Sequence, residues 1–148
     1  MSLVLDGSNG ITTPGPVNGA ATMLSPITNS LSGNVSLSNT SLYFDGPSVA
    51  QGTSGTWFVS GIICMKDGDV GNSQYFAKLW DGTTVIASGI ASAIGQNNYA
   101  SISLSGYISS PAGNLRISCR DIFSTSGLML FNQSGNSKDS TITAIRIG

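Results

Sequence analysis

The stretch NYASISLS, residues 98–105, alternates apolar and polar side chains almost from end to end. Successive side chains of a β-strand point to opposite faces, so this stretch would have one apolar face and one polar face. The apolar face would carry Ala100, Ile102 and Leu104, and the polar face Tyr99, Ser101 and Ser103. The stretch therefore predicts a strand with one side on a protein core and the other side facing outward.

Similar signals occur on both sides of this strand. TWFVSGIICM at 56–65 is the longest strand signal, and NLRISC at 114–119 alternates as clearly as 98–105. Asp81-Gly82 separates two further strand signals and favours the turn that joins a β-hairpin. Nine strands are predicted in all, at residues 35–37, 41–44, 56–65, 74–80, 83–88, 98–105, 114–119, 127–131 and 140–147. The segment 41–44 precedes Asp45-Gly46, which also reads as a turn.

Nine short strands without a predicted helix indicate a sandwich or barrel. We expect an all-β fold, with an antiparallel β-sandwich over residues 33–148. The pattern does not give the order of the strands in the sheets. Residues 1–32 read as an extended N-terminal arm, because Thr13-Pro14-Gly15-Pro16 and Ser25-Pro26 interrupt regular structure. The arm starts with an isolated apolar strand at Leu3, Val4 and Leu5. We expect this strand to attach to a neighbouring protein by strand addition.

The composition points to assembly with other protein. Charged residues make up 9% of the chain, against about 25% in an average soluble domain, and Glu and His are absent. Apolar residues make up 40% and fall in periodic runs, which argues against disorder. The net charge is −1 and no basic stripe is visible, so nucleic acid is not an expected partner. No stretch approaches the length of a membrane span, so no membrane partner is expected.

Nothing in the sequence marks a catalytic or cofactor site. The chain has no His to activate a nucleophile, and its seven Asp residues are scattered, mostly beside Gly or in turns. We expect no enzyme activity, no cofactor and no metal. The segment 66–72, KDGDVGN, resembles the start of a calcium loop but lacks the acidic residue at the far end, so an ordinary turn is favoured. Cys64 and Cys119 are read as two buried thiols, with a disulfide as the alternative.

Two features suggest contacts with other molecules. The last strand, STITAIRI at 140–147, is partly apolar on both faces, as expected for a strand that is central in its sheet or at a subunit interface. Ile142, Ile145 and Ile147 are the predicted interface residues. Trp80 adjoins the Asp81-Gly82 turn and is the aromatic residue best placed to contact a glycan.

These segments carry a resemblance to a known class of proteins. SLVLDGSNGIT resembles the opening of many bacteriophage tail-fibre and virion proteins. Residues 55–148 resemble the C-terminal domain of such proteins, through GTWFVSG, KLWDGTTVIASG, SISLSGYISSPAGNLRISCRD and GNSKDSTITAIRIG. The domain also looks similar to the trimeric jelly rolls of the C1q and tumour-necrosis-factor type. In those, the final strand lies near the threefold axis.

The resemblance implies a virion protein, assembled in the host cytoplasm and built into a particle. The expected function is a non-enzymatic structural appendage: a homotrimeric spike, tail fibre, head fibre or capsid decoration protein, attached to other virion proteins by residues 1–32. Two alternatives stay open. One is a receptor-binding module for a bacterial surface glycan, and the other is a secreted β-sandwich lectin or adhesin with a Cys64–Cys119 disulfide.

Overall fold

The computed structural model describes residues 4–6, 10–12, 25–68 and 71–148, and these contain strands but no helix. None of the described segments forms a helix long and apolar enough to cross a membrane. The strands are β1 Val4–Asp6, β2 Gly10–Thr12, β3 Ile27–Ser30, β4 Val35–Ser36, β5 Phe44–Val49, β6 Thr56–Lys66, β7 Asn72–Trp80, β8 Val85–Ile94, β9 Tyr99–Ser109, β10 Leu115–Asp121, β11 Leu128–Met129 and β12 Thr141–Arg146. The all-β prediction is confirmed.

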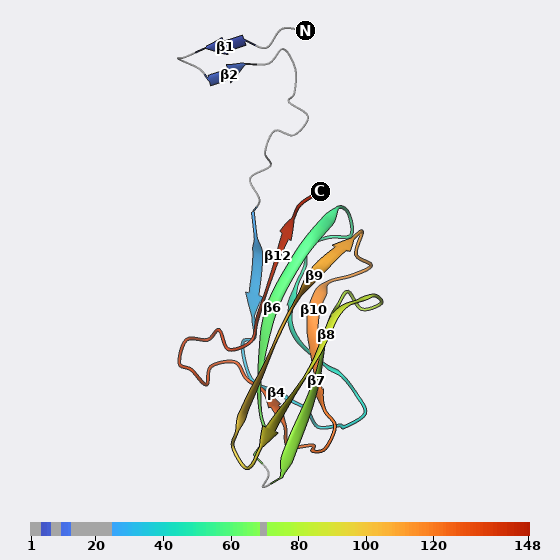
Figure 1. Ribbon diagram of the computed structural model, residues 1–148, viewed down its shortest axis with the longest axis vertical. Helices are drawn as coiled ribbons and strands as arrows, with labels where there is room; N and C mark the ends of the chain where they lie inside the picture. The colour runs from blue at the N-terminus through green and yellow to red at the C-terminus, as the bar shows by residue number, and fades with distance from the viewer. Residues whose placement is uncertain (1–3, 7–9, 13–24, 69–70) are drawn as a thin grey trace.

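Two antiparallel sheets face each other and form a sandwich (Figure 1). The smaller sheet has the strand order β5-β10-β7-β8. The larger sheet has the order β3-β12-β6-β11-β4, and β9 pairs with the other side of β6 along its full length. Consequently β8 is an edge strand of the smaller sheet, and β9 is an edge strand of the larger one.

The core lies between the inner faces of the two sheets. Ile102 and Leu104 of β9 are buried there, and Tyr99, Ser101 and Ser103 are exposed, as the alternation predicted. The inward side chains of β6 and β10 are buried as well, among them Val59, Ile63, Met65, Leu115, Ile117 and Cys119. Burial of this apolar set is the main favourable term for the fold, because each large side chain withdrawn from water contributes about 1.5–3 kcal/mol.

The β7–β8 hairpin is confirmed at the predicted Asp-Gly turn. Gly82 has φ +98°, a conformation that glycine adopts without strain. The Asp81 carboxylate is buried and accepts hydrogen bonds from the backbone N–H groups of Thr83 (2.9 Å), Thr84 (2.6 Å) and Ala112 (2.7 Å). The third bond ties the hairpin to the segment that precedes β10.

Asp45-Gly46 is not a turn, which corrects the prediction for this segment. The two residues lie inside β5, where the register against β10 shifts between Arg116 and Ser118. A Cβ at Gly46 would come within 2.9 Å of the Ile117 carbonyl oxygen. Glycine here allows a close approach at a β-bulge, and the strand continues to Val49.

The sandwich begins earlier in the chain than the predicted start at residue 33. Ile27–Ser30 form β3, which pairs with β12 from Ala144↔Ile27 to Thr141↔Ser30. The sequence signal missed β3 because ITNS carries one apolar residue in four, too few for a periodic pattern.

The N-terminal strand has a partner of its own. Val4–Asp6 pair antiparallel with Gly10–Thr12, so β1 and β2 form a two-stranded sheet where a lone strand and a loop were expected. Of the three predicted attachment residues, Val4 and Leu5 lie in β1, and Leu3 lies outside the described residues.

Candidate functional site

The outer face of the larger sheet is the first candidate for a functional surface. We call it the uncharged face. It is built from the outward side chains of the three strands β12, β6 and β9. These are Thr141, Thr143 and Ile145; Thr56, Phe58, Ser60, Ile62 and Cys64; and Ser101, Ser103, Ser105, Tyr107 and Ser109. None of these side chains is charged. Lys66 adjoins the face at one end, and Lys138 adjoins its margin, where it donates to the Ser30 hydroxyl of β3 at 3.2 Å.

An apolar patch lies on this face at the end of the sheet nearest the C-terminus. Phe58 pairs in register with Ile145 on one side and with Tyr107 on the other. The Phe58 and Tyr107 rings are tilted, with centroids 5.1 Å apart. Tyr107 is 67% exposed although it belongs to a regular strand. A contiguous group of this kind on an outward sheet face is typical of a surface that contacts another protein.

Three pairs of hydroxyl groups bond each other along the margins of this face. Thr28 and Thr143 join their hydroxyl oxygens at 2.9 Å, and Ser30 donates to Thr141 at 3.1 Å. Thr56 and Ser109 are 2.9 Å apart on the far side. Short side chains that already bond each other lose little conformational freedom on contact with a partner.

The two edge strands β8 and β9 extend the uncharged region around one side of the sandwich. No charged residue occurs between Asp81 and Arg116, a span that covers both strands. Ile90, Ile94 and Tyr99 are exposed along it. Proteins usually protect a long edge strand with a charge, a proline or a bulge. Neither strand contains a charge or a proline, and β8 is bulged only at its start, where its pairing with β7 skips Ile86.

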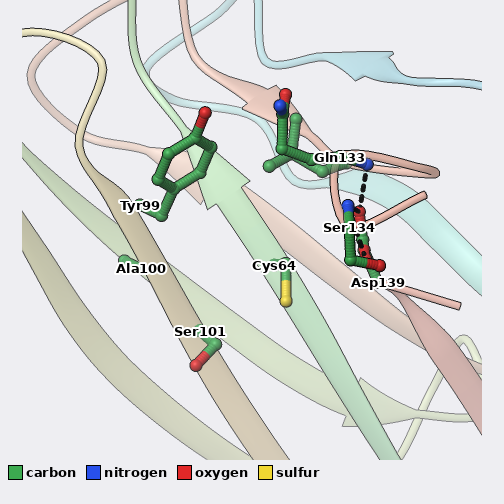
Figure 2. Close-up of a pocket in the computed structure, with 8 residues that line it drawn as sticks. Cys64, Tyr99, Ala100, Ser101, Gln133, Ser134 and Asp139 are labelled. Atoms are coloured by element: carbon green, nitrogen blue, oxygen red, sulfur yellow. Dashed lines mark hydrogen bonds between the residues drawn. The ribbon is translucent and has the colours of Figure 1, made fainter. Parts of the chain in front are cut away.

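A cavity of about 320 Å³ lies at the end of this face that is remote from Phe58. It is lined by Cys64, Tyr99, Ala100, Ser101, Leu130, Gln133, Ser134 and Asp139. Figure 2 shows its three sources: Cys64 from β6, Tyr99 and Ser101 from β9, and the remaining polar side chains from the loop before β12.

The carboxylate and the thiol of the cavity are poorly placed for chemistry. The Asp139 carboxylate accepts the backbone N–H groups of Gln133 and Ser134, and the hydrogen bonds from Ser134 hold its pKa below the ordinary value. Burial, with a smaller effect of Asp139, raises the pKa of the Cys64 thiol. A thiol with a raised pKa stays protonated at neutral pH and is a poor nucleophile.

The outer face of the smaller sheet is the second candidate surface, and its chemistry is different. We call it the cation–aromatic face. Its side chains come from β5, β7 and β10 and from the residue before β5. They are Tyr43, Asp45, Phe76, Lys78, Trp80, Arg116, Ser118 and Arg120.

The cations of this face lie over its aromatic rings. Lys78 Nζ is 3.2 Å from the centroid of the Trp80 ring and 4.6 Å from that of Tyr43. The Arg120 guanidinium carbon lies 5.0 Å from the Tyr43 centroid and 5.3 Å from that of Phe76. The Arg116 guanidinium carbon lies 5.3 Å from the Trp80 centroid. Cations within about 6 Å of a ring face are attracted by its electron-rich surface.

Trp80 is less available than the sequence suggested. Its side chain is half-buried, and the indole N–H donates to the Ser118 hydroxyl at 2.6 Å. Lys78 also lies over the ring. Trp80 therefore forms part of a packed face, and the side chain does not stand free beside the turn.

The predicted interface residues fall in different places. Ile142 is fully buried in the core and has no surface to offer a subunit, which corrects that part of the prediction. Ile145 lies on the uncharged face, and Ile147 follows β12 and is 49% exposed. β12 is central in its sheet, between β3 and β6, which is one of the two positions that its composition indicated.

Both cysteines are free, and they lie in different sheets. Cys64 is on the outward side of β6 and Cys119 on the inward side of β10. The disulfide that the lectin alternative invoked is absent from the structure. The segment 66–72 joins β6 to β7, with residues 69–70 outside the description. In the described chain no group of three His, Cys, Asp or Glu side chains gathers to hold a metal ion.

Sequence reasoning missed most of the residues of both faces. Alternation within β6 and β9 places Phe58 and Tyr107 on the outward side, so the direction of both side chains could be predicted from the sequence. The contact between the two rings could not be predicted, because the pairing of β6 with β9 joins residues far apart in the chain. The same is true of Lys78, Arg116 and Arg120, which the pairing of β7 with β10 brings together.

Comparison with known proteins locates the fold and leaves the family open. No protein-family model matches the chain, and no curated protein matches it. Among solved structures, the chain is similar to the Eiger TNF from S. frugiperda, with a TM-score of 0.51 and 12% identity over 84% of this chain and 93% of that one. A match to the C-terminal CBM6 of LamC, a marine laminarinase from Zobellia galactanivorans, has a TM-score of 0.34 and 17% identity over 70% and 72% of the two chains. The first likeness shows a TNF-like β-sandwich, and the second is too distant to carry an argument.

Proposed function

We propose that this protein is a non-enzymatic structural module that assembles with copies of itself through the uncharged face. The carrying observation is the outer face of β12, β6 and β9, which holds the exposed Tyr107 beside the half-buried Phe58 and Ile145 and has no charged side chain of its own. Obligate interfaces between subunits are depleted in charge and enriched in aromatic residues. The edge formed by β8 and β9 supports the same proposal, because it carries no charge or proline and β8 is bulged only at its start.

The proposed assembly is a homotrimer. The resemblance to trimeric jelly rolls supports this stoichiometry, and β12 at the centre of the larger sheet is consistent with a final strand near a threefold axis. A closed ring of three copies would cover both the uncharged face and the β8–β9 edge if the edge of one copy met the face of the next. The cation–aromatic face would stay exposed in that arrangement, because it lies on the opposite sheet.

The proposed setting is a bacteriophage particle, in which the chain serves as a spike, fibre or decoration protein. The resemblance of SLVLDGSNGIT and of residues 55–148 to virion proteins supports this setting. In this proposal the N-terminal segment with Leu3, Val4 and Leu5 attaches the module to another virion protein. Because β1 already pairs with β2, strand addition would extend an existing two-stranded sheet.

Light scattering coupled to size-exclusion chromatography tests the assembly. The wild-type protein should elute at about three times the 15.1 kDa mass of one chain. Ser105→Asp puts a charge on the uncharged face, opposite Ser60, and should produce monomers because an unpaired charge is costly to bury. Ser48→Asp, on the outer face of the smaller sheet, is the matched control and should stay trimeric. A wild-type monomer, or a Ser105→Asp trimer, would contradict the proposal.

Labelling of purified particles tests the virion setting separately. Gold-labelled antibody against the native protein should mark the particles in negative-stain electron microscopy. A protein lacking residues 2–12 should still fold and assemble but fail to join the particle. Particles that carry no label, with an antibody that recognises the native protein, would remove the virion setting and leave the self-assembly proposal standing.

A further inference from the structure

The basic residues of this chain are concentrated on the cation–aromatic face. The chain has six basic residues, and three of them, Lys78, Arg116 and Arg120, lie on this one surface. A single carboxylate, that of Asp45, accompanies them. It pairs with Arg116 at 2.7 Å, the one ion pair in the described part of the chain. Lys78 and Arg120 therefore have no ion-pair partner there, and the face carries excess positive charge.

The three cations form a row. Lys78 pairs in register with Ser118, which lies midway between Arg116 and Arg120 on the adjacent strand. Since a strand rises about 3.3 Å per residue, the backbone positions of Arg116, Lys78 and Arg120 advance by about 7 Å at each step along the strand direction, with Lys78 on the neighbouring strand. A row of about 13 Å is longer than one carboxylate or sulfate group can span. The arrangement matches a polymer with repeated anionic groups better than a single small anion.

The aromatic rings support the cations and leave little room for ligand stacking. Lys78 covers Trp80 and lies over Tyr43, and Arg120 lies over Tyr43 and Phe76. The indole N–H of Trp80 already donates a hydrogen bond to the Ser118 hydroxyl. A neutral sugar or a nucleobase would need an open ring face, whereas an anionic group needs the outward N–H donors of the cations.

The cations of this face have few negatively charged or hydrogen-bond-accepting neighbours. The Nε atoms of Arg116 and Arg120 are buried without a hydrogen-bond partner. Burial lowers the pKa of Lys78; Arg116 lowers it further, and Asp45 acts in the opposite direction. An anion bound across the row would supply the missing negative charge.

We infer that the cation–aromatic face binds an acidic polysaccharide, with its anionic groups held by Arg116, Lys78 and Arg120. The inference goes beyond the proposed self-assembly and rests on the opposite sheet. In a trimer three such faces would act together, and the combined affinity for one polymer would exceed that of a single face.

Binding of defined polysaccharides to the full-length protein tests the inference. Isothermal titration with polygalacturonate and with dextran sulfate should give binding that weakens as salt is raised, and neutral dextran should give none. The double variant Lys78→Gln/Arg120→Gln should bind polygalacturonate at least about tenfold more weakly. The control Lys66→Gln/Lys138→Gln removes the same charge elsewhere and should bind within about twofold of wild type.

Four outcomes would overturn the inference. They are no binding of either acidic polymer, equal binding of neutral dextran, equal weakening in the two double variants, and tighter binding of a single-stranded oligonucleotide than of polygalacturonate. Light scattering on the same samples reports the oligomeric state. Loss of polysaccharide binding with an intact oligomer separates a failure on this face from a failure of the self-assembly proposal.

Discussion

The two outer faces of this sandwich are built from the same kind of antiparallel strand and have opposite chemistry. The uncharged face carries hydroxyl groups around the Phe58, Tyr107 and Ile145 patch and has no charge of its own. The cation–aromatic face carries three cations and one carboxylate over three aromatic residues. In a chain with so few charged residues, this separation is a strong constraint on function. One face is suited to permanent burial against protein, and the other is suited to contact with a charged ligand in water.

The contrast also concerns hydrogen bonds. On the uncharged face, hydroxyl groups bond each other across strands, as Thr28 does with Thr143. On the cation–aromatic face, side chains of unlike chemistry are linked, as Trp80, Ser118 and Asp45 are through two successive bonds of 2.6 Å. Neutral pairs can be desolvated at modest cost, whereas burying a charge is expensive. This difference is the reason why the proposed subunit interface is placed on the first face.

The largest effect is expected from removing the apolar patch. Phe58→Ala/Tyr107→Ala deletes the two rings that lie 5.1 Å apart. Aromatic anchors at the centre of an interface contribute about 2 kcal/mol or more each. Because two anchors are lost, we expect the dissociation constant of the oligomer to rise by about 700-fold, measured by analytical ultracentrifugation. Phe123→Ala, at a 65% exposed position outside both faces, is the control. An unchanged dissociation constant in the double variant would place the interface elsewhere.

A smaller effect, on folding, is expected at the turn that supports the cation–aromatic face. Asp81→Asn weakens the hydrogen bonds from Thr83, Thr84 and Ala112 to a buried carboxylate. We expect the free energy of unfolding to fall by about 1–3 kcal/mol in urea titrations at pH 7. A change below about 0.5 kcal/mol would show that the loop does not depend on this carboxylate.

The same residue gives a pH dependence of known sign. Burial tends to raise the pKa of Asp81, but the three backbone N–H groups outweigh it, so the pKa lies below the ordinary 3.8. A carboxyl group with a lowered pKa in the folded state adds stability above its unfolded pKa, and this stability is lost as pH falls through the folded value. Unfolding titrations between pH 5 and pH 2 should therefore show a steeper loss for wild type than for Asp81→Asn. Parallel curves would contradict the assignment.

The smallest effect on stability is expected at Asp45. Asp45→Asn removes the ion pair with Arg116, whose two side chains are 50% and 27% exposed. Exposed pairs contribute about 0–1 kcal/mol, so the unfolding midpoint should change little. The variant frees the third cation of the row, and we expect polygalacturonate to bind more tightly. Weaker binding, measured by the same titration, would indicate that Asp45 positions Arg116 for the ligand.

Local sequence determined the strands and the sides of each strand. Alternation at 98–105 and 114–119 gave the inward and outward sides of β9 and β10, and Asp81-Gly82 gave the hairpin, because strand periodicity and turn chemistry depend on neighbouring residues. The sequence also showed that the chain has too few charged residues to place one on every part of its surface. These are properties of short windows and of composition, so they need no knowledge of distant partners.

Only the tertiary structure decided which strands share a sheet. It placed β3 beside β12, kept Asp45-Gly46 within β5 at a bulge, and put Ile142 in the core while Ile145 faces outward. It also brought Lys78 between Arg116 and Arg120, and set Phe58 against Tyr107. Pairing between strands far apart in the chain depends on the fit of whole faces in the core, and that fit is not encoded in any one window. Both candidate surfaces arise from such pairings.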